Sequence, residues 1–311
     1  MDYKSSAELL KEYDEFLLVT HKNPDGDTMG SAAALCSALR RAGKTAWLFA
    51  NEQAGDRLKA YVAKYFAPEG YKPRSVICVD TASEGLMPKG FSGSADFCVD
   101  HHPSNTHYAK EYLVCGEKAS CGEIVLELIK ELCGDVTAEE ATLLYIAVTT
   151  DTGCFQYLNT KADTLRAAAE LIELGADTMS VNLNFFREIS RARMMLEGMV
   201  YSSMEFYRDG KISVATVTQQ MLKSCGAVQD DLDDLAGLAG RAKGCVLNIT
   251  IRELEDGSSK ISLRSYPEVN CSDICAVFGG GGHAMAAGCT ISSEPRRAKE
   301  LLLAVIDEVW K

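Results

Sequence analysis

The chain has 311 residues, of which 47% are hydrophobic and 24% charged, a composition that is typical of a globular protein and excludes a disordered or fibrous one. Its length favours two domains, because a single hydrophobic core seldom grows beyond about 250 to 300 residues. The formal charge of −12 makes a long nucleic-acid duplex an unfavourable partner, although a local pocket can still bind a short anion.

The cysteines and the first residues indicate a reducing compartment. The 12 cysteines are dispersed without a CxxC pair, and many lie in apolar runs, as Cys78 and Cys98 do. The initial stretch MDYKSSAELLKEYDEF lacks the apolar core of a signal peptide, and no apolar run approaches the roughly 18 residues of a membrane span. We therefore expect a cytoplasmic protein with no membrane partner.

Short apolar runs alternate with helical stretches in the first half of the chain. The runs are FLLVTH at 16–21, TAWLFA at 45–50, SVICVD at 75–80 and DFCVD at 96–100. Such runs are typical of parallel strands. Residues 30–43 favour a helix that ends with Arg40 and Arg41 and is capped by Gly43. These patterns predict an α/β domain with a mainly parallel sheet flanked by helices.

The second half becomes helical and then returns to strands. Residues 121–175 are mostly helical, and residues 185–204, rich in Arg and Met, indicate a helical connector. Strands are predicted at 211–218 and twice within 245–266, followed by a Gly-rich stretch at 278–288 and an amphipathic helix. We predict one domain at 1–184, a connector at 185–204 and a smaller α/β domain at 205–311.

Histidines and aspartates gather near the ends of the apolar segments. Taken alone, each aspartate is typical of a helix cap or a turn. Taken together they would meet at the carboxyl edge of a parallel sheet, where ligands bind. The aspartates are Asp25, Asp27, Asp80, Asp100 and Asp151, and the histidines that stand beside Asp or Gly clusters are His21, His101, His102 and His283.

Clustered carboxylates repel one another unless a cation neutralises them, so this pattern predicts a metal centre. Carboxylate oxygens with one or two imidazoles suit Mn²⁺ or Mg²⁺ better than a zinc site rich in sulfur, and imidazole favours Mn²⁺. The candidate ligands outnumber the needs of one ion, which indicates two ions about 3.5 to 4 Å apart. Such a pair lowers the pKa of a shared water and suits displacement at phosphorus.

The sequence resembles the DHH phosphoesterases that carry a C-terminal DHHA1 domain. The resemblance depends on five motifs in order: HKNPDGDTMGS at 21–31, ICVDTA at 77–82, DHH at 100–102, TTDTGCF at 149–155 and GGGGHAMAAG at 279–288. It implies that His21, Asp25 and Asp80 hold one metal. It also implies that Asp80 bridges to a second metal, whose further ligands are Asp27, His101 and Asp151.

Two further residues of the DHH motif are expected to act beside the metals. We predict that Asp100 orients an imidazole, with a purely structural role as the alternative. His102 is expected to donate to a substrate phosphate or to help protonate a leaving oxygen.

The glycine run ahead of His283 can turn tightly and present several N–H groups to an anion. A flexible linker is the alternative, but an apolar strand follows the run directly. The run lacks the Lys-Ser/Thr pair of a P-loop. The resemblance implies that this loop, at Gly280, Gly281, Gly282 and His283, grips a terminal phosphate together with Arg264 in the preceding strand.

Family members with only these two domains resemble the oligoribonuclease that degrades very short RNA and removes a phosphate from 3′-phosphoadenosine 5′-phosphate (PAP). The resemblance implies a phosphoesterase with two Mn²⁺ per chain, for which Mg²⁺ can substitute. Hydrolysis of cyclic di-AMP or its linear product is the alternative activity. A non-catalytic nucleotide sensor is an alternative from a different functional class. An exposed sheet edge or the Met-rich connector could support a homodimer.

Overall fold

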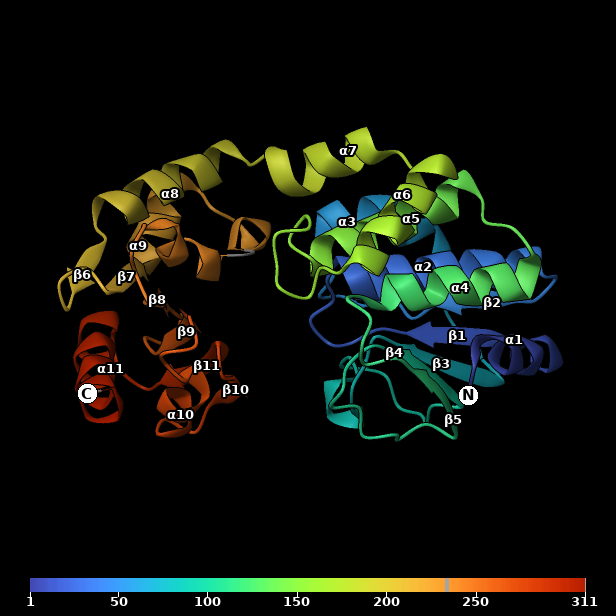
Figure 1. Cartoon of the computed structure of the whole chain (residues 1–311), viewed down its shortest axis with the longest axis horizontal. Coiled ribbons are helices and arrows are strands. Elements are labelled where there is room, and N and C mark those ends of the chain that lie inside the picture. Colours follow the sequence, from blue (N-terminus) through green and yellow to red (C-terminus); the bar gives the residue numbers. More distant parts are fainter. Residues whose placement is uncertain (233–234, 311) are drawn as a thin grey trace. The chain divides into compact units, whose positions relative to one another are not determined.

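The computed structural model describes residues 1–232 and 235–310, and the chain divides into two compact units, Met1–Glu188 and Ile189–Lys311 (Figure 1). Each unit has its own sheet and its own core, so the predicted α/β class with two sheets is confirmed. The predicted connector includes the end of a π-helical turn, Leu183–Arg187, and helix α8, Arg191–Ser202. Among the described residues, no helix has the length and apolar character needed to cross a bilayer.

The first unit is built on a five-stranded parallel sheet in the order β2-β1-β3-β4-β5. All four apolar runs of the sequence form strands of this sheet. The fifth strand was not predicted, because only Leu113 of it is buried and its pattern is that of an exposed edge. The strands are β1 Phe16–Val19, β2 Ala46–Leu48, β3 Ser75–Val79, β4 Phe97–Asp100 and β5 Glu111–Val114.

Helices cover one face of this sheet, with α2 at their centre. Helix α2 contacts strands β1 to β3 and also α4 and α5, so it is buried on nearly every side. Small residues permit this approach: a Cβ on Gly30 would lie 2.4 Å from the carbonyl oxygen of Leu143. The helices are α1 Tyr3–Glu12, α2 Gly26–Arg41, α3 Asp56–Val62, α4 Cys121–Cys133, α5 Ala138–Asp151, α6 Ala162–Glu173 and α7 Thr178–Asn182.

Irregular segments cover the opposite face of the sheet. Leu17, Val76 and Cys78 point to this side and form a small separate cluster. The loops supply large side chains that pack on it, namely Phe49, Tyr71, Met87, Phe91 and Tyr108. The predicted parallel sheet with flanking helices is thus confirmed, with the long helices packed on one face and irregular segments on the other.

The second unit contains a six-stranded mixed sheet in the order β10-β11-β9-β8-β7-β6, with β7 and β8 parallel and the other pairs antiparallel. The two strands predicted within 245–266 are β8 and β9, joined around Asp256 and Gly257. Gly257 has a φ of +80°, which suits this tight turn. The strands are β6 Glu205–Tyr207, β7 Ile212–Val217, β8 Leu247–Glu253, β9 Ser259–Ser265, β10 Gly281–His283 and β11 Ala286–Ile291.

Strand alternation divides the second sheet into two unlike faces. Ile249, Ile261 and Leu263 point to one face and pack with helices α10, Cys271–Ala276, and α11, Pro295–Val309. On the other face, α8, α9 Gln219–Cys225 and the short turns within 235–241 cover the part formed by β7 and β8. The part formed by β9 and β11 presents polar and small residues.

Candidate active site

The strand order creates a switch point between β1 and β3. From β1 the chain runs to β2 on one side and then returns to β3 on the other. In such sheets, ligands bind outside the carboxyl ends of the strands at the switch point. The chain places His21, Asp25 and Asp27 after β1, Asp80 after β3 and Asp100 at the end of β4. The structure therefore brings these predicted residues to one edge.

The turn between β1 and α2 is held by its own aspartate. Asp25 caps α2, and its Oδ1 accepts hydrogen bonds from the N–H groups of Asp27 and Thr28, each at 3.1 Å. Gly26 has no room for a side chain, because a Cβ there would lie 2.3 Å from Thr150 Oγ1. The turn thus lies directly against the end of α5, which brings it close to Asp151.

Asp80 lies between two groups of possible ligands. Its Oδ2 is 3.6 Å from His21 Nε2, and its Oδ1 is 3.4 Å from His101 Nε2. The side chain is buried, and Oδ1 has no hydrogen-bond partner among the described residues. Its backbone has a φ of +55°, a left-handed conformation that is uncommon for a residue other than glycine. A buried, unsatisfied carboxylate oxygen on an unusual backbone is typical of a functional site.

The second group surrounds His101. Its Nε2 lies 3.7 Å from Asp27 Oδ2 and 3.6 Å from Asp151 Oδ2. On the other side of Asp80, His21 Nε2 lies 3.7 Å from Asp25 Oδ2. Asp151 ends helix α5 rather than a strand, yet it reaches the same edge of the sheet. All six predicted metal ligands therefore come together.

Asp27 is anchored to the beginning of helix α4. Its carboxylate accepts hydrogen bonds from the N–H groups of Cys121, at 2.7 Å, and Gly122, at 2.9 Å, and from Ser31 Oγ at 3.1 Å. The positive end of the helix dipole favours the charged form of this buried side chain. These contacts fix the direction of the Asp27 carboxylate.

The carboxylate of Asp100 lies between the ring of His102 and the buried side chain of Asn105. Its Oδ1 lies 2.7 Å from His102 Nδ1, and its Oδ2 accepts a 2.6 Å hydrogen bond from Asn105 Nδ2. Asp100 is fully buried and Asn105 is nearly so. Asn105 lies in the same DHHPSN segment but was not predicted as a site residue, because an asparagine in such a segment is typical of a turn. The structure makes it the partner that holds Asp100.

The cluster is electrostatically strained. Burial raises the pKa of Asp27 well above its usual value, and the charges of Asp80, Asp151 and Asp25 add to this effect. Burial also raises the pKa of Asp151 to about 6. Burial opposes a charge on His21, but the neighbouring carboxylates of Asp25 and Asp80 raise its pKa to about 10. The cluster thus favours positive charge at its centre, which protons or metal cations can supply.

The donor set fits divalent cations. Carboxylate oxygens with imidazole nitrogens suit Mn²⁺ or Mg²⁺, and the buried Asp80 Oδ1, which has no hydrogen-bond partner among the described residues, is a free acceptor for such an ion. Three groups have ligand atoms within 4.8 Å of one another: His21, Asp25 and Asp80; Asp27, His101 and Asp151; and Asp80, His101 and His102.

In the second unit, the predicted phosphate-binding residues share one row of the sheet. Ala286 of β11 pairs with Arg264 on one side and with His283 of β10 on the other. Residues paired across a sheet point to the same face, so Arg264 and His283 flank a small alanine side chain. Arg264 is exposed, and its NH1 group donates to the carbonyl of Leu263.

The glycine run forms part of a hairpin rather than an open loop. Gly281, Gly282 and His283 form β10, which pairs with β11. The N–H of Gly280 donates to the carbonyl of Cys275, so this group is already engaged within the fold. Gly280 instead permits close approach, because a Cβ there would lie 2.3 Å from the carbonyl oxygen of Gly288.

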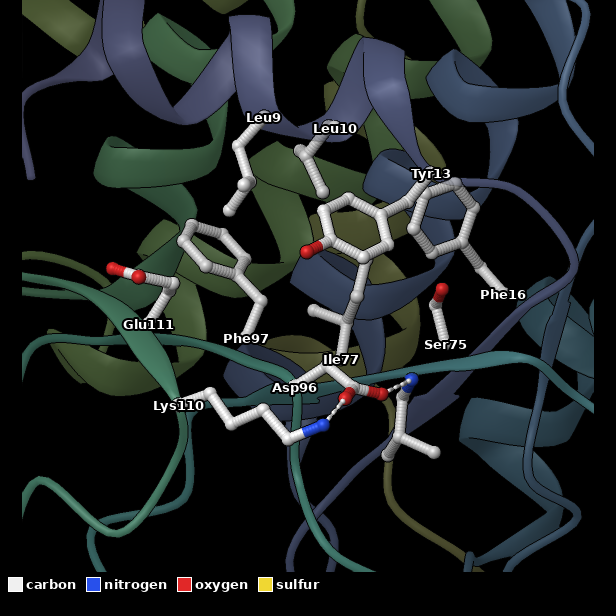
Figure 2. Close-up of a pocket in the computed structure, with 11 residues that line it drawn as sticks. Leu9, Leu10, Tyr13, Phe16, Ser75, Ile77, Asp96, Phe97, Lys110 and Glu111 are labelled. Carbon is white, nitrogen blue, oxygen red and sulfur yellow. Dashed lines mark hydrogen bonds and ion pairs between the residues drawn. The ribbon is translucent and has the colours of Figure 1, made fainter.

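An apolar pocket of about 140 Å³ lies at the opposite end of the first sheet (Figure 2). Leu10, Phe16 and Phe97 line it, and Lys110 pairs with Asp96 beside it at 2.7 Å. Its residues come from α1 and from the amino-terminal ends of strands. Its volume is below the range of about 300 to 1,000 Å³ usual for ligand pockets, and it contains none of the predicted site residues.

Models of known protein domains match the greater part of each unit. The model of the DHH family N-terminal domain matches residues 15–148, and that of the DHHA1 domain matches residues 202–311. The chain belongs to the DHH family. This confirms the resemblance seen in the sequence and makes the protein a hydrolase of the phosphoesterase class.

Known relatives of this DHH protein span its length. The bifunctional oligoribonuclease and PAP phosphatase NrnA of Thermus thermophilus is 32% identical over 97% of this chain and 92% of its own length. The cyclic-di-AMP phosphodiesterase PdeA of Listeria monocytogenes is 27% identical over 98% of this chain but 49% of its own length. An exopolyphosphatase-related protein from Bacteroides fragilis shares the fold, with a TM-score of 0.88 over 98% of this chain and 96% of that chain at 22% identity.

A substitution of Asn105 tests whether its hydrogen bond to Asp100 stabilises the folded protein. Asn105→Ala leaves the buried Asp100 carboxylate without its 2.6 Å partner, so we expect the free energy of unfolding of the metal-free protein to fall by about 1.5 to 3 kcal/mol. Asn23→Ala, at an exposed position on the same edge, should change it by less than about 0.5 kcal/mol. Equal effects of the two substitutions in urea denaturation would contradict the anchoring role.

Proposed function

We propose that this protein is a two-metal phosphoesterase that hydrolyses short oligoribonucleotides and removes a phosphate from PAP. The observation that supports this proposal most strongly is the position of Asp80, whose two carboxylate oxygens face separate clusters of histidine and aspartate. A shared carboxylate of this kind suits a pair of cations, and paired cations suit displacement at phosphorus.

Within this proposal, His21, Asp25 and Asp80 hold one Mn²⁺, with Mg²⁺ as a substitute. The second ion is held by Asp80 together with Asp27, His101 and Asp151. When bound, the two ions polarise the phosphate and lower the pKa of a water that can attack it. Two imidazoles in the donor set favour Mn²⁺ over Mg²⁺.

His102 is proposed to contact the substrate. Asp100 engages its Nδ1, so Nε2 is the nitrogen left to donate to a phosphate or to a leaving oxygen. His102 also lies beside the metal cluster, with Nδ1 3.6 Å from Asp80 Oδ1. Asp100 thus has an orienting role, because it fixes the direction of the ring.

Arg264 and His283 are proposed to bind a phosphate of the substrate, together with the N–H groups of Gly281 and Gly282. The planar guanidinium suits two parallel hydrogen bonds to phosphate. The substrate class follows from the NrnA relative, which covers nearly the whole chain. The net charge of −12 further favours a short anion over a long polyanion.

Hydrolysis of cyclic di-AMP or of its linear product is a second candidate. It is supported by the relative PdeA, which matches this chain over 98% of its residues. This chain spans about half of PdeA, so its match carries less weight than the NrnA match.

A substrate panel tests the proposed function. Purified protein with Mn²⁺ should hydrolyse PAP and RNA of two to five nucleotides with a higher kcat/KM than a 24-mer or cyclic di-AMP. Arg264→Ala should lower kcat/KM on the favoured substrates by roughly 10- to 150-fold, because a charge-assisted phosphate contact is lost, and should leave bound metal unchanged. A preference for cyclic di-AMP would favour the second candidate, and loss of metal from Arg264→Ala would refute its assigned role.

Asp80→Asn tests the shared ligand. Asparagine tolerates the left-handed backbone at this position, so the substitution removes charge without adding backbone strain. We expect no detectable turnover and Mn²⁺ binding at least about 100-fold weaker by calorimetry, with an unchanged circular dichroism spectrum. Asp209→Asn, at an exposed left-handed aspartate with a φ of +53°, is the matched control and should bind two ions normally. Normal metal content in Asp80→Asn would rule out the bridging role.

A further inference from the structure

One face of the second sheet presents three cations in a regular pattern. On β9, Ile261 and Leu263 point into the core, so Lys260 and Arg264 point to the opposite face. The register places Arg252 of β8 directly beside Lys260. Lys260 and Arg264 are exposed and Arg252 is partly exposed.

Small side chains surround these cations on the neighbouring strand. On β11, Thr290 pairs with Lys260, and Gly288 pairs with Ser262, which lies between Lys260 and Arg264. The β11 residues that pair with Lys260 and Ser262 are therefore small. Lys260, Ser262 and Arg264 thus form one row on this face, with Arg252 beside Lys260.

No acidic side chain lies within ion-pair distance of Arg252, Lys260 or Arg264 in the part of the chain that the structure describes. Other basic residues of this unit do have such partners; Lys299 pairs with Glu205, and Arg208 pairs with Asp307. Like charges directly opposite each other on a sheet are unfavourable. Burial and then the charge of Arg252 lower the pKa of Lys260. A bound anion would relieve this repulsion.

The spacing along β9 separates two binding positions. Lys260 and Arg264 are four residues apart, which corresponds to about 13 Å in an extended strand. The two phosphates of a single nucleoside bisphosphate do not span that distance. A chain of several nucleotides does, because it repeats a phosphate at every residue.

We propose that Arg252 and Lys260 form a second phosphate-binding subsite, which contacts an internucleotide phosphate of an oligoribonucleotide while Arg264 holds another. PAP does not reach this subsite, so the pair determines specificity for substrate length. The inference rests on the proposed function, because it assumes that the face bearing Arg264 binds substrate.

The test compares a long and a short ligand on the same variants. Arg252→Gln and Lys260→Gln should each weaken binding of a fluorescently labelled RNA pentamer by about 10-fold in anisotropy measurements without divalent metal. Each should change PAP affinity by less than about 2-fold, a threshold set well below the loss of one charge-assisted contact. Each should also lower the magnitude of the salt dependence of pentamer binding by about 0.7 in the log–log slope, the value for one phosphate contact on a single strand.

Arg296→Gln is the matched control. It removes the same charge from the exposed surface of α11, the helix that packs on the opposite face of the sheet, and should leave both affinities unchanged. Equal losses for pentamer and PAP, or no loss for either, would overturn the subsite. If the wild-type protein binds the pentamer through this pair but hydrolyses neither ligand with Mn²⁺, the subsite stands and the proposed function fails.

Discussion

Repulsion among buried carboxylates is the constraint on which the site depends. Asp25, Asp27, Asp80 and Asp151 converge on two imidazoles, and the pKa values of Asp27 and Asp151 rise because burial and mutual repulsion disfavour their charged forms. A protein tolerates such a cluster when cations neutralise it. The unpartnered Oδ1 of Asp80 is the clearest sign, because a buried oxygen without a hydrogen-bond donor requires another source of positive charge.

The fold meets this constraint with close packing around the switch point. Helix α2 begins inside the site, and Gly26 and Gly30 let it approach α5 without a side chain in between. Helix α4 directs its first N–H groups at Asp27, and Asn105 holds Asp100 from the interior. The ligands therefore come from separate strands and helices, and their directions are set by neighbours that do not themselves bind metal.

Much of the convergence of the site could be predicted from sequence, because most of the aspartates follow short apolar runs that form strands, as Asp80 follows SVICV, and parallel strands share one edge. Asp151 instead ends helix α5. The supporting contacts could not be predicted in this way. Asp27 and Cys121 are 94 residues apart, and no local pattern indicates that they meet. Gly280 was predicted to bind an anion, yet its N–H donates to the carbonyl of Cys275 near the end of α10, a helix-end contact that the glycine run alone does not indicate.

The central claim is that two cations share Asp80, and a crystal structure of the Mn²⁺-loaded protein with anomalous diffraction at the manganese edge tests it most directly. The account predicts two anomalous peaks about 3.5 to 4 Å apart. One peak should lie among His21, Asp25 and Asp80, and the other among Asp27, Asp80, His101 and Asp151. A single peak, or two peaks that do not share Asp80, would contradict it.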